Sequence, residues 1–217
     1  MARGTDFGGI HSHFDLRLIQ QKVEVQPAEP KLNLIEIPGA DGFKDYSETP
    51  AGRVTYKPRR ILWTFALYPG ENWDEKRSEV EGKLNGVSCQ ITLDTDPGYY
   101  YQGRLAVSKY NLDRSLRQIT VEAVCQPYKL KQLETSESMD ITTSYKPMLL
   151  FNSRKPVTPI ITVTVPSTIM WQGGTYSLAA GSHKILGLQF QEGENQLQVK
   201  TSSGTGRVTI TYREGAL

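Results

Sequence analysis

The stretch LNGVSCQITLDTDPGYYYQGR, residues 84–104, decides the fold of this chain. It is interpreted as a helix end, a strand, a turn and the start of a second strand. Apolar and polar residues alternate along its first half, which is the pattern of a half-buried strand. Residues 94–98 contain a Pro-Gly pair and predict a turn, so the next strand is expected from Tyr99. The alternating apolar residues are Val87, Cys89, Ile91 and Leu93.

A helix is predicted immediately before this stretch. Asn72 is a suitable N-cap, and Glu75 stands three residues later in a capping-box-like arrangement. Lys83 in the last turn suits the helix dipole, and Asn85-Gly86 forms a stop signal. One face of this helix is apolar and consists of Trp73, Val80 and Leu84.

Four further segments of the first part of the chain indicate strands. Alternation is clean over residues 61–67 and 119–125, which predicts two half-buried strands. A short strand is expected over residues 14–18. The apolar pattern shifts phase once between residues 32 and 37, which predicts a bulged strand followed by turns.

Period-2 alternation continues from Thr158 to the end of the chain. Turn signals at residues 173–174, 181–182, 193–195 and 203–206 separate short strands at regular spacing, which favours a small β-sandwich. Residues 129–147 are polar and predict either an inter-domain connection or an edge strand. The expected inward faces contain Ile161, Val163 and Val165, then Leu186, Leu188 and Phe190, then Leu197 and Val199, then Val208, Ile210 and Tyr212.

Composition excludes several functional classes. The 217 residues carry a net charge of +2, and their Lys and Arg residues are scattered, so a surface that follows phosphates is not indicated. No apolar run approaches the about 18–20 residues of a membrane span. Residues 1–9 lack the apolar core of a signal peptide, so we expect the chain to be made and kept in a cytoplasm until it is released.

Several segments together resemble the distal tail proteins of siphophages, a family also found in prophages of Gram-positive bacteria. After Trp73 and the helix ending in LNG, the segments ITLDTDPGYYYQGRL at 91–105 and ITVEAVCQPYK at 119–129 are the most specific. IEIPGADG at 35–42, followed by a charged loop and a strand, also resembles the family. The C-terminal VTPIITVT and ITYREGAL are similar to the galectin-like end domain of such proteins.

The resemblance implies a mainly β protein with two domains. Residues 1–135 would form a β-barrel-like, ring-forming domain similar to the tail tube protein, with one α-helix. Residues 136–217 would form a small galectin-like β-sandwich. The implied role is that of a structural virion component, a hexameric ring that acts as baseplate hub and joins the tail tube to the apparatus for host attachment.

The same resemblance implies partners and a location. The partners would be further copies of the chain, the tail tube protein, a tail-associated tip protein and a receptor-binding protein. No membrane and no sequence-specific nucleic acid are expected, although the genome would pass through the ring. The location would be the tail tip of a virion assembled in the host cytoplasm.

Two groups of residues are candidates for the ring and tail interfaces. Tyr99, Tyr100 and Tyr101 place rings on both faces of a strand, so one face should meet solvent or another chain. The long polar loop at residues 43–58 is expected to reach a neighbouring subunit. Its candidate contact residues are Phe43, Tyr46 and Arg53.

No catalytic motif is present, and no enzymatic activity, cofactor or metal is expected. Asp94 and Asp96 are interpreted as turn-forming acids rather than a catalytic pair. The pattern His11-Ser-His13 is interpreted as surface or interface polarity, with a metal pair as the alternative. Cys89 and Cys125 are predicted to be reduced and buried, with a disulfide as the alternative.

Two other functions remain open at this point. Trp171 and Tyr176, beside Gly173-Gly174, could stack on a sugar ring, which would make the chain a carbohydrate-binding module. A role for both residues in the core or at the rim of the sandwich is the competing interpretation. The chain could also be the equivalent hub of a genome-free, tail-like particle, which the sequence cannot distinguish from a phage tail.

Overall fold

The computed structural model describes residues 4–111 and 117–217 of the protein. The chain is mainly β and divides into two compact units, Met1–Lys129 and Leu130–Leu217. Each unit has its own hydrophobic core. Within the described residues, no helix combines the length and the apolar composition needed to cross a lipid bilayer.

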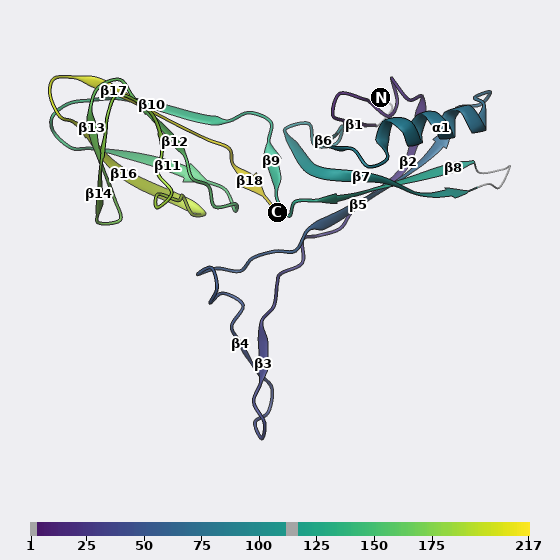
Figure 1. Ribbon diagram of the computed structural model, residues 1–217, viewed down its shortest axis with the longest axis horizontal. Helices are drawn as coiled ribbons and strands as arrows, with labels where there is room; N and C mark the ends of the chain where they lie inside the picture. Colours follow the sequence, from purple (N-terminus) through teal and green to yellow (C-terminus); the bar gives the residue numbers. More distant parts are fainter. Residues whose placement is uncertain (1–3, 112–116) are drawn as a thin grey trace. The chain divides into compact units, whose positions relative to one another are not determined.

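The first unit is built on a curled antiparallel sheet, and its helix packs against β7 (Figure 1). The strand order along the sheet is β1-β6-β7-β8-β5-β2. The elements are β1 (Thr5–Phe7), β2 (Leu18–Val25), β5 (Arg59–Leu67), α1 (Trp73–Leu84), β6 (Ser88–Leu93), β7 (Tyr99–Asn111) and β8 (Gln118–Cys125).

The strands predicted by clean alternation are confirmed. Ile61, Trp63 and Phe65 on β5 are fully buried, and Trp63 stands opposite Val121 of β8. The intervening residues of both strands lie on the other face of the sheet, as the period of 2 requires. The deciding stretch also folds as predicted, with β6, a turn at residues 94–98 and β7.

The predicted helix and its caps are confirmed. The Asn72 side chain accepts hydrogen bonds from the backbone N–H groups of Asp74 and Glu75, at 3.0 and 3.5 Å. Gly86, just beyond the helix, adopts φ +78°, a conformation that costs glycine little. Val80 and Leu84 are buried in the core of the first unit, so they anchor the helix to the sheet.

The strand predicted over residues 14–18 is wrong. Residues 12–16 form a turn, in which the backbone N–H groups of Asp15 and Leu16 both donate to the His11 carbonyl. Phe14 is 74% exposed, whereas Leu16 and Leu18 are buried. The apparent alternation therefore combined a turn with the first residue of β2.

Residues between β2 and β5 form a hairpin arm, defined here as residues 26–58. Its two short strands, β3 (Leu34–Glu36) and β4 (Phe43–Asp45), pair in regular register. The strand predicted over residues 32–37 is therefore present at Leu34–Glu36, but the predicted bulge is wrong. Phe43, expected at the start of a loop, begins β4 instead, because the Pro38–Gly42 segment reverses the chain with glycines at positive φ.

The second unit is a β-sandwich of two four-stranded antiparallel sheets, as predicted. The strand orders are β10-β17-β12-β15 and β11-β16-β13-β14, and β9 pairs with β18 outside the two sheets. The strands are β9 (Lys129–Lys131), β10 (Thr135–Ile141), β11 (Lys146–Asn152), β12 (Ile160–Val163), β13 (Ser167–Trp171), β14 (Gly174–Leu178), β15 (Gly181–Lys184), β16 (Gly193–Thr201), β17 (Gly206–Tyr212) and β18 (Gly215–Ala216).

Most of the expected inward residues of the sandwich are buried, but one group differs. Leu188 and Phe190 are fully buried without belonging to a named strand, and Leu186 is 85% exposed. Gly181 and Gly193, interpreted as turn residues, begin β15 and β16. Residues 135–141 form β10 at the edge of one sheet, so the edge-strand interpretation of this region is confirmed.

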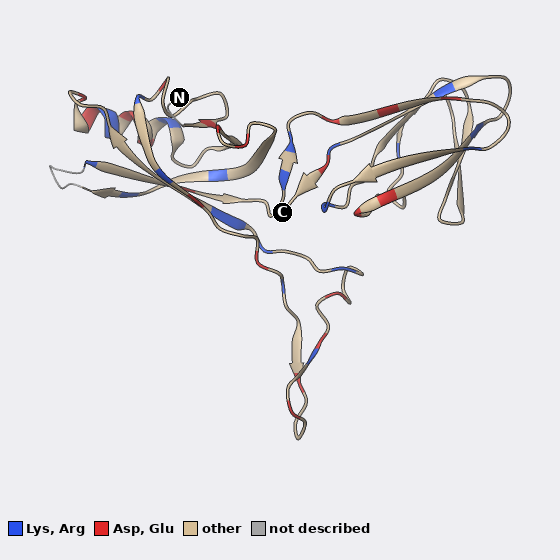
Figure 2. Cartoon of the chain, turned by 180° about the vertical axis from the view of Figure 1, so that it is seen from behind, with Lys and Arg blue, Asp and Glu red and all other residues tan. Residues whose placement is uncertain are grey.

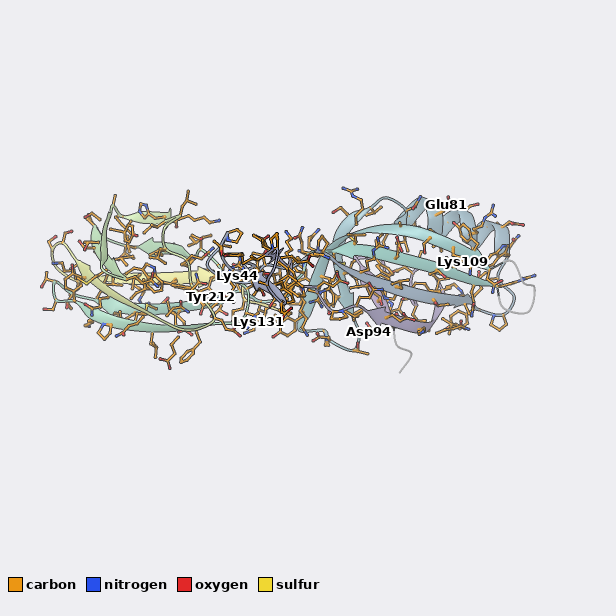
Figure 3. The ribbon with its side chains drawn as sticks, turned by 90° about the horizontal axis from the view of Figure 1, so that it is seen from below. Lys44, Glu81, Asp94, Lys109, Lys131 and Tyr212 are labelled. Atoms are coloured by element: carbon orange, nitrogen blue, oxygen red, sulfur yellow. The ribbon has the colours of Figure 1, made fainter. Side chains whose placement is uncertain are left out.

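A hydrogen-bonded carboxylate holds the entry and exit of the second unit together. Glu214 accepts from Lys131 Nζ at 2.5 Å, from Thr135 Oγ1 at 2.7 Å and from Ser153 Oγ at 2.5 Å (Figure 3 labels Lys131). Burial raises the pKa of Glu214, but these hydrogen bonds together lower the pKa below its ordinary value. The carboxylate therefore stays ionised and fixes the ends of β9, β10 and β11.

Candidate assembly interface

The hairpin arm exposes an unusual amount of apolar surface. Six of its large apolar side chains are between 39% and 60% exposed. An isolated two-stranded hairpin is marginally stable in water, and apolar side chains gathered on one exposed segment typically mark a binding surface. The arm is therefore the feature of the first unit that most needs a partner. The exposed side chains are Leu32, Leu34, Ile35, Ile37, Phe43 and Tyr46.

Backbone hydrogen bonds define the base of the arm. Lys31 donates to the Thr55 carbonyl and Lys57 donates to the Glu29 carbonyl, each at 2.8 Å. Farther out, Ser47 Oγ accepts from the backbone N–H of Asn33 at 2.8 Å. These bonds set the strand pairing of the arm, but they bury little of its apolar surface.

The outer part of the arm carries more acid than base. Residues 31–50 contain four carboxylates, from Glu36, Asp41, Asp45 and Glu48, and two lysines, whereas the base adds Glu29, Arg53 and Lys57. Figure 2 shows these charges along the hairpin. Asp45 accepts from the side chain and backbone of Ser47, which lowers the pKa of its carboxyl. The arm thus offers apolar contacts together with a net negative charge.

Three of the predicted interface residues lie on this arm. Phe43 and Tyr46 are exposed, so both are available to a neighbour. Arg53 is partly buried near the base, where its Nη1 donates to the Val54 carbonyl at 3.2 Å and lies 3.5 Å from the Tyr128 hydroxyl. The sequence did not identify Leu32, Leu34, Ile35 and Ile37 as exposed, although the Pro38–Gly42 turn between two apolar runs was a usable signal for a hairpin.

The tyrosine triplet is placed differently from the prediction. Tyr100 and Tyr101 are each only 6% exposed, and Tyr101 belongs to the core of the first unit. Tyr99 is partly buried, with Lys129 Nζ 4.5 Å from its ring centroid. The rings of Tyr100 and Tyr101 are therefore covered within the single chain, Tyr99 is partly open, and an interface role for the triplet stays a prediction.

The proposed sugar-stacking pair is also covered. Trp171 is 5% exposed and packs against Phe190, with ring centroids 5.7 Å apart. Tyr176 is partly buried against the same core. The competing interpretation of a core role describes Trp171, and the structure leaves its ring no open face for a sugar.

The titratable residues singled out in the sequence are tied into local structure. Asp94 accepts from the Gly4 backbone at 2.7 Å and lies 3.2 Å from His11 Nε2. His13 lies 3.0 Å from the Tyr68 hydroxyl, and Asp96 pairs with Lys129 at 2.7 Å. Among the described residues, no group of three or more His, Cys, Asp or Glu side chains could hold a metal ion. These contacts fasten loops and turns.

Comparisons with known proteins give a strong match among solved structures. No protein-family model matches the sequence, and no curated protein matches it significantly. The fold matches the crystal structure of the Dit protein (gp 19.1) of SPP1, with a TM-score of 0.68 and 16% sequence identity. The match covers 100% of both chains. That protein is described as a paradigm of the hub adsorption apparatus in phages that infect Gram-positive bacteria.

The match extends over both units of this chain and over the whole of the solved structure. An identity of 16% is too low to carry residue roles from one chain to the other. The structural match is sufficient to establish the shared architecture, because it covers the whole of both chains. The resemblance of this sequence to siphophage distal tail proteins is therefore confirmed in the fold, which the chain shares along its whole length with SPP1 Dit.

Proposed function

We propose that the chain is a structural subunit of a phage tail hub, a distal tail protein that assembles into a hexameric ring. The ring joins the tail tube on one side to the tail-tip and host-recognition apparatus on the other. Its partners are further copies of itself, the tail tube protein, a tail-associated tip protein and a receptor-binding protein. It resides at the tail tip of a virion assembled in the host cytoplasm.

The observation that carries this proposal is the full-length match to a hub protein. A match limited to one unit would support only a common β-sandwich, which hosts many unrelated functions. Here the match extends over both units of the chain. That combination supports an assembly role for the whole molecule.

The arm supplies a physical reason for assembly. A closed ring uses head-to-tail contacts in which one patch of a subunit meets a different patch of the next. The arm presents apolar side chains that are exposed in the single chain, and covering them on a neighbour is favourable by about 25 cal/mol per Å². We infer that the arm of each subunit contacts the next, in an interface of at least about 1,200 Å².

The proposed work is binding rather than catalysis. The titratable side chains noted above are engaged in structural contacts, and the proposal requires no cofactor. The hub would let the genome pass through its ring without sequence-specific contacts. The same chemistry would serve a genome-free, tail-like particle, which differs in what surrounds the hub.

The test is the mass of the assembly and its dependence on the arm. Native mass spectrometry and light scattering are expected to give a hexamer for the full chain, alone or on purified tail tubes. The double variant Leu34→Ser, Phe43→Ser is expected to remain folded and to lose the ring. The matched control, Leu133→Ser with Leu186→Ser, removes exposed apolar side chains of the second unit and should keep the ring.

A chain that stays monomeric at high concentration and also fails to assemble on tube tips would contradict the proposal. Equal loss of the ring in both double variants would show that the arm has no special part in it.

A further inference from the structure

Arg59, the first residue of β5, is a buried cation without an anionic partner. Only 5% of its surface is exposed. Its Nε has no hydrogen-bond partner, and among the described residues no carboxylate lies within 4.0 Å of its guanidinium. Its guanidinium lies over the ring of Tyr101, whose centroid is 5.5 Å from Arg59 Cζ.

The neighbouring cation Lys129 already has a carboxylate partner of its own. Lys129 is near enough to Tyr101 for the two to interact electrostatically, and its Nζ bonds Asp96 at 2.7 Å. The hydrogen bond to Asp96 raises the pKa of Lys129, so this amine stays charged. The nearby carboxylate of Asp96 is therefore already committed to Lys129.

A buried charge is stable when it is paired, and an aromatic ring replaces an anion only in part. An arginine side chain does not become neutral when it is buried, because the pKa of a guanidinium is higher than that of any other side chain. Its planar fork is also suited to a carboxylate. An arginine in this setting indicates a site whose anion comes from outside the chain.

We propose that Arg59 is the buried half of a carboxylate-binding site, filled on assembly by an acidic side chain from the arm of a second copy of this chain. The site consists of Arg59 and Tyr101, with Lys129 beside them. This inference rests on the proposed ring, and it identifies where on the neighbour the acidic arm binds.

Charge complementarity favours the arm as the source. The outer part of the arm, residues 31–50, has four carboxylates against two lysines, and Glu36, Asp41 and Glu48 are exposed on it. Asp45 is less suited, because Ser47 already donates to it. A single carboxylate matches the site better than a phosphate backbone, since one guanidinium is unpaired and the charge of Lys129 is already paired with Asp96.

The test compares Arg59→Met with Arg60→Met, which removes the same charge from the exposed neighbouring residue. Self-association is measured by sedimentation equilibrium, and the melting temperature is measured on dilute monomer. Arg59→Met is expected to weaken association at least tenfold and to leave the monomer melting temperature unchanged or higher, because an unpaired buried charge has been removed. Arg60→Met should leave association unchanged.

The acidic partner is identified by measuring self-association in three arm variants, Glu36→Gln, Asp41→Asn and Glu48→Gln. One of them should weaken association as much as Arg59→Met does, and its combination with Arg59→Met should add no further loss. A lower monomer melting temperature with intact association in Arg59→Met would overturn the proposal. So would three arm variants that all assemble normally.

Failure of the ring itself is distinguished with acetate as the probe. Replacing chloride by acetate at constant ionic strength should raise the melting temperature of the wild-type monomer but not that of Arg59→Met. If the wild type never assembles yet acetate protects it, the ring and the arm as source are overturned and the carboxylate site is retained. If acetate has no Arg59-dependent effect and assembly is normal in Arg59→Met, the site is overturned.

Discussion

At the scale of single residues, the two cysteines show how the sheet controls reactivity. Cys89 and Cys125 both stand opposite Gly103, so they occupy one cross-strand row on either side of a glycine. Two strand spacings separate their Cα atoms by about 9–10 Å, beyond the about 7 Å limit for a disulfide. Both thiols are free, as predicted. Cys125 is also buried as predicted, whereas Cys89 is only partly buried.

Burial makes Cys125 unreactive in the folded protein. It raises the pKa of this thiol to about 12, from 9.0, so at pH 8 only roughly one molecule in 10⁴ carries the thiolate. We expect iodoacetamide to leave Cys125 unmodified in the native state and to modify it after unfolding, as read by peptide mass spectrometry. Rapid native labelling of Cys125 would show that this end of the sheet opens.

The same shift predicts a pH dependence of stability. The folded state binds the Cys125 proton more tightly than the unfolded state, so this contribution is fully present below pH 9. It is lost as the pH rises from about 9 towards about 12. The melting temperature of the first unit should therefore fall more steeply above pH 9 in the wild type than in Cys125→Ala.

At the scale of elements, α1 owes its stability to its caps and to a narrow buried face. Asn72 provides the N-cap, and only Lys76, Val80 and Leu84 are buried. Lys76 and Lys83 both pair with Glu79, at 2.6 and 2.8 Å, which lowers the pKa of the Glu79 carboxyl. Tyr110 of β7 donates to Glu81 at 3.0 Å and ties the helix to the sheet. Figure 3 labels Glu81 on the helix.

Two substitutions in this helix should act in opposite directions. Asn72→Ala removes the cap and should destabilise the first unit by about 1 kcal/mol. Gly82→Ala should stabilise it by about 0.5–1 kcal/mol, because a Cβ there meets nothing within 4 Å and the helix interior disfavours glycine. Urea denaturation followed by circular dichroism measures both. A higher free energy of unfolding in Asn72→Ala would mean that the Asn72 cap does not stabilise the helix.

At the scale of the whole molecule, the chain contains two separate hydrophobic cores. Trp63 and Phe65 are fully buried in the first, and Ile169 and Phe190 in the second. No buried residue of the described chain belongs to both clusters. Because cooperativity arises within a shared core, we expect the units to unfold in separate transitions.

Differential scanning calorimetry with one core variant in each unit tests this. Phe65→Ala should lower only the transition of the first unit, and Ile169→Ala only that of the second, each by about 2–5 kcal/mol of unfolding free energy. Total tryptophan fluorescence does not separate the two transitions by itself, because it sums the emission of Trp63 in the first unit and Trp171 in the second. A single transition that shifts equally in both variants would show that the units fold as one.

Local pattern was enough for much of the fold. The alternation in β5, β6 and β8, the Asn72 cap and the Gly86 stop depend on neighbours within a few residues, so the sequence alone identified them. It failed at residues 14–18, where a turn imitates alternation, and at Leu186, whose expected inward face is open to solvent. A period of 2 distinguishes two faces of a strand, but it does not say what covers each face.

For the candidate interface too, the sequence determined some features and the tertiary structure decided others. The sequence by itself determined that the chain is mainly β, with one capped helix and a polar, turn-rich segment ahead of β5 that includes Phe43 and Tyr46. Only the tertiary structure decided that this segment is an apolar hairpin arm, that Tyr100 and Trp171 are covered, and that Arg59 is buried without an anion. The physical reason is that burial and charge pairing depend on contacts between segments distant in sequence, which no local pattern records.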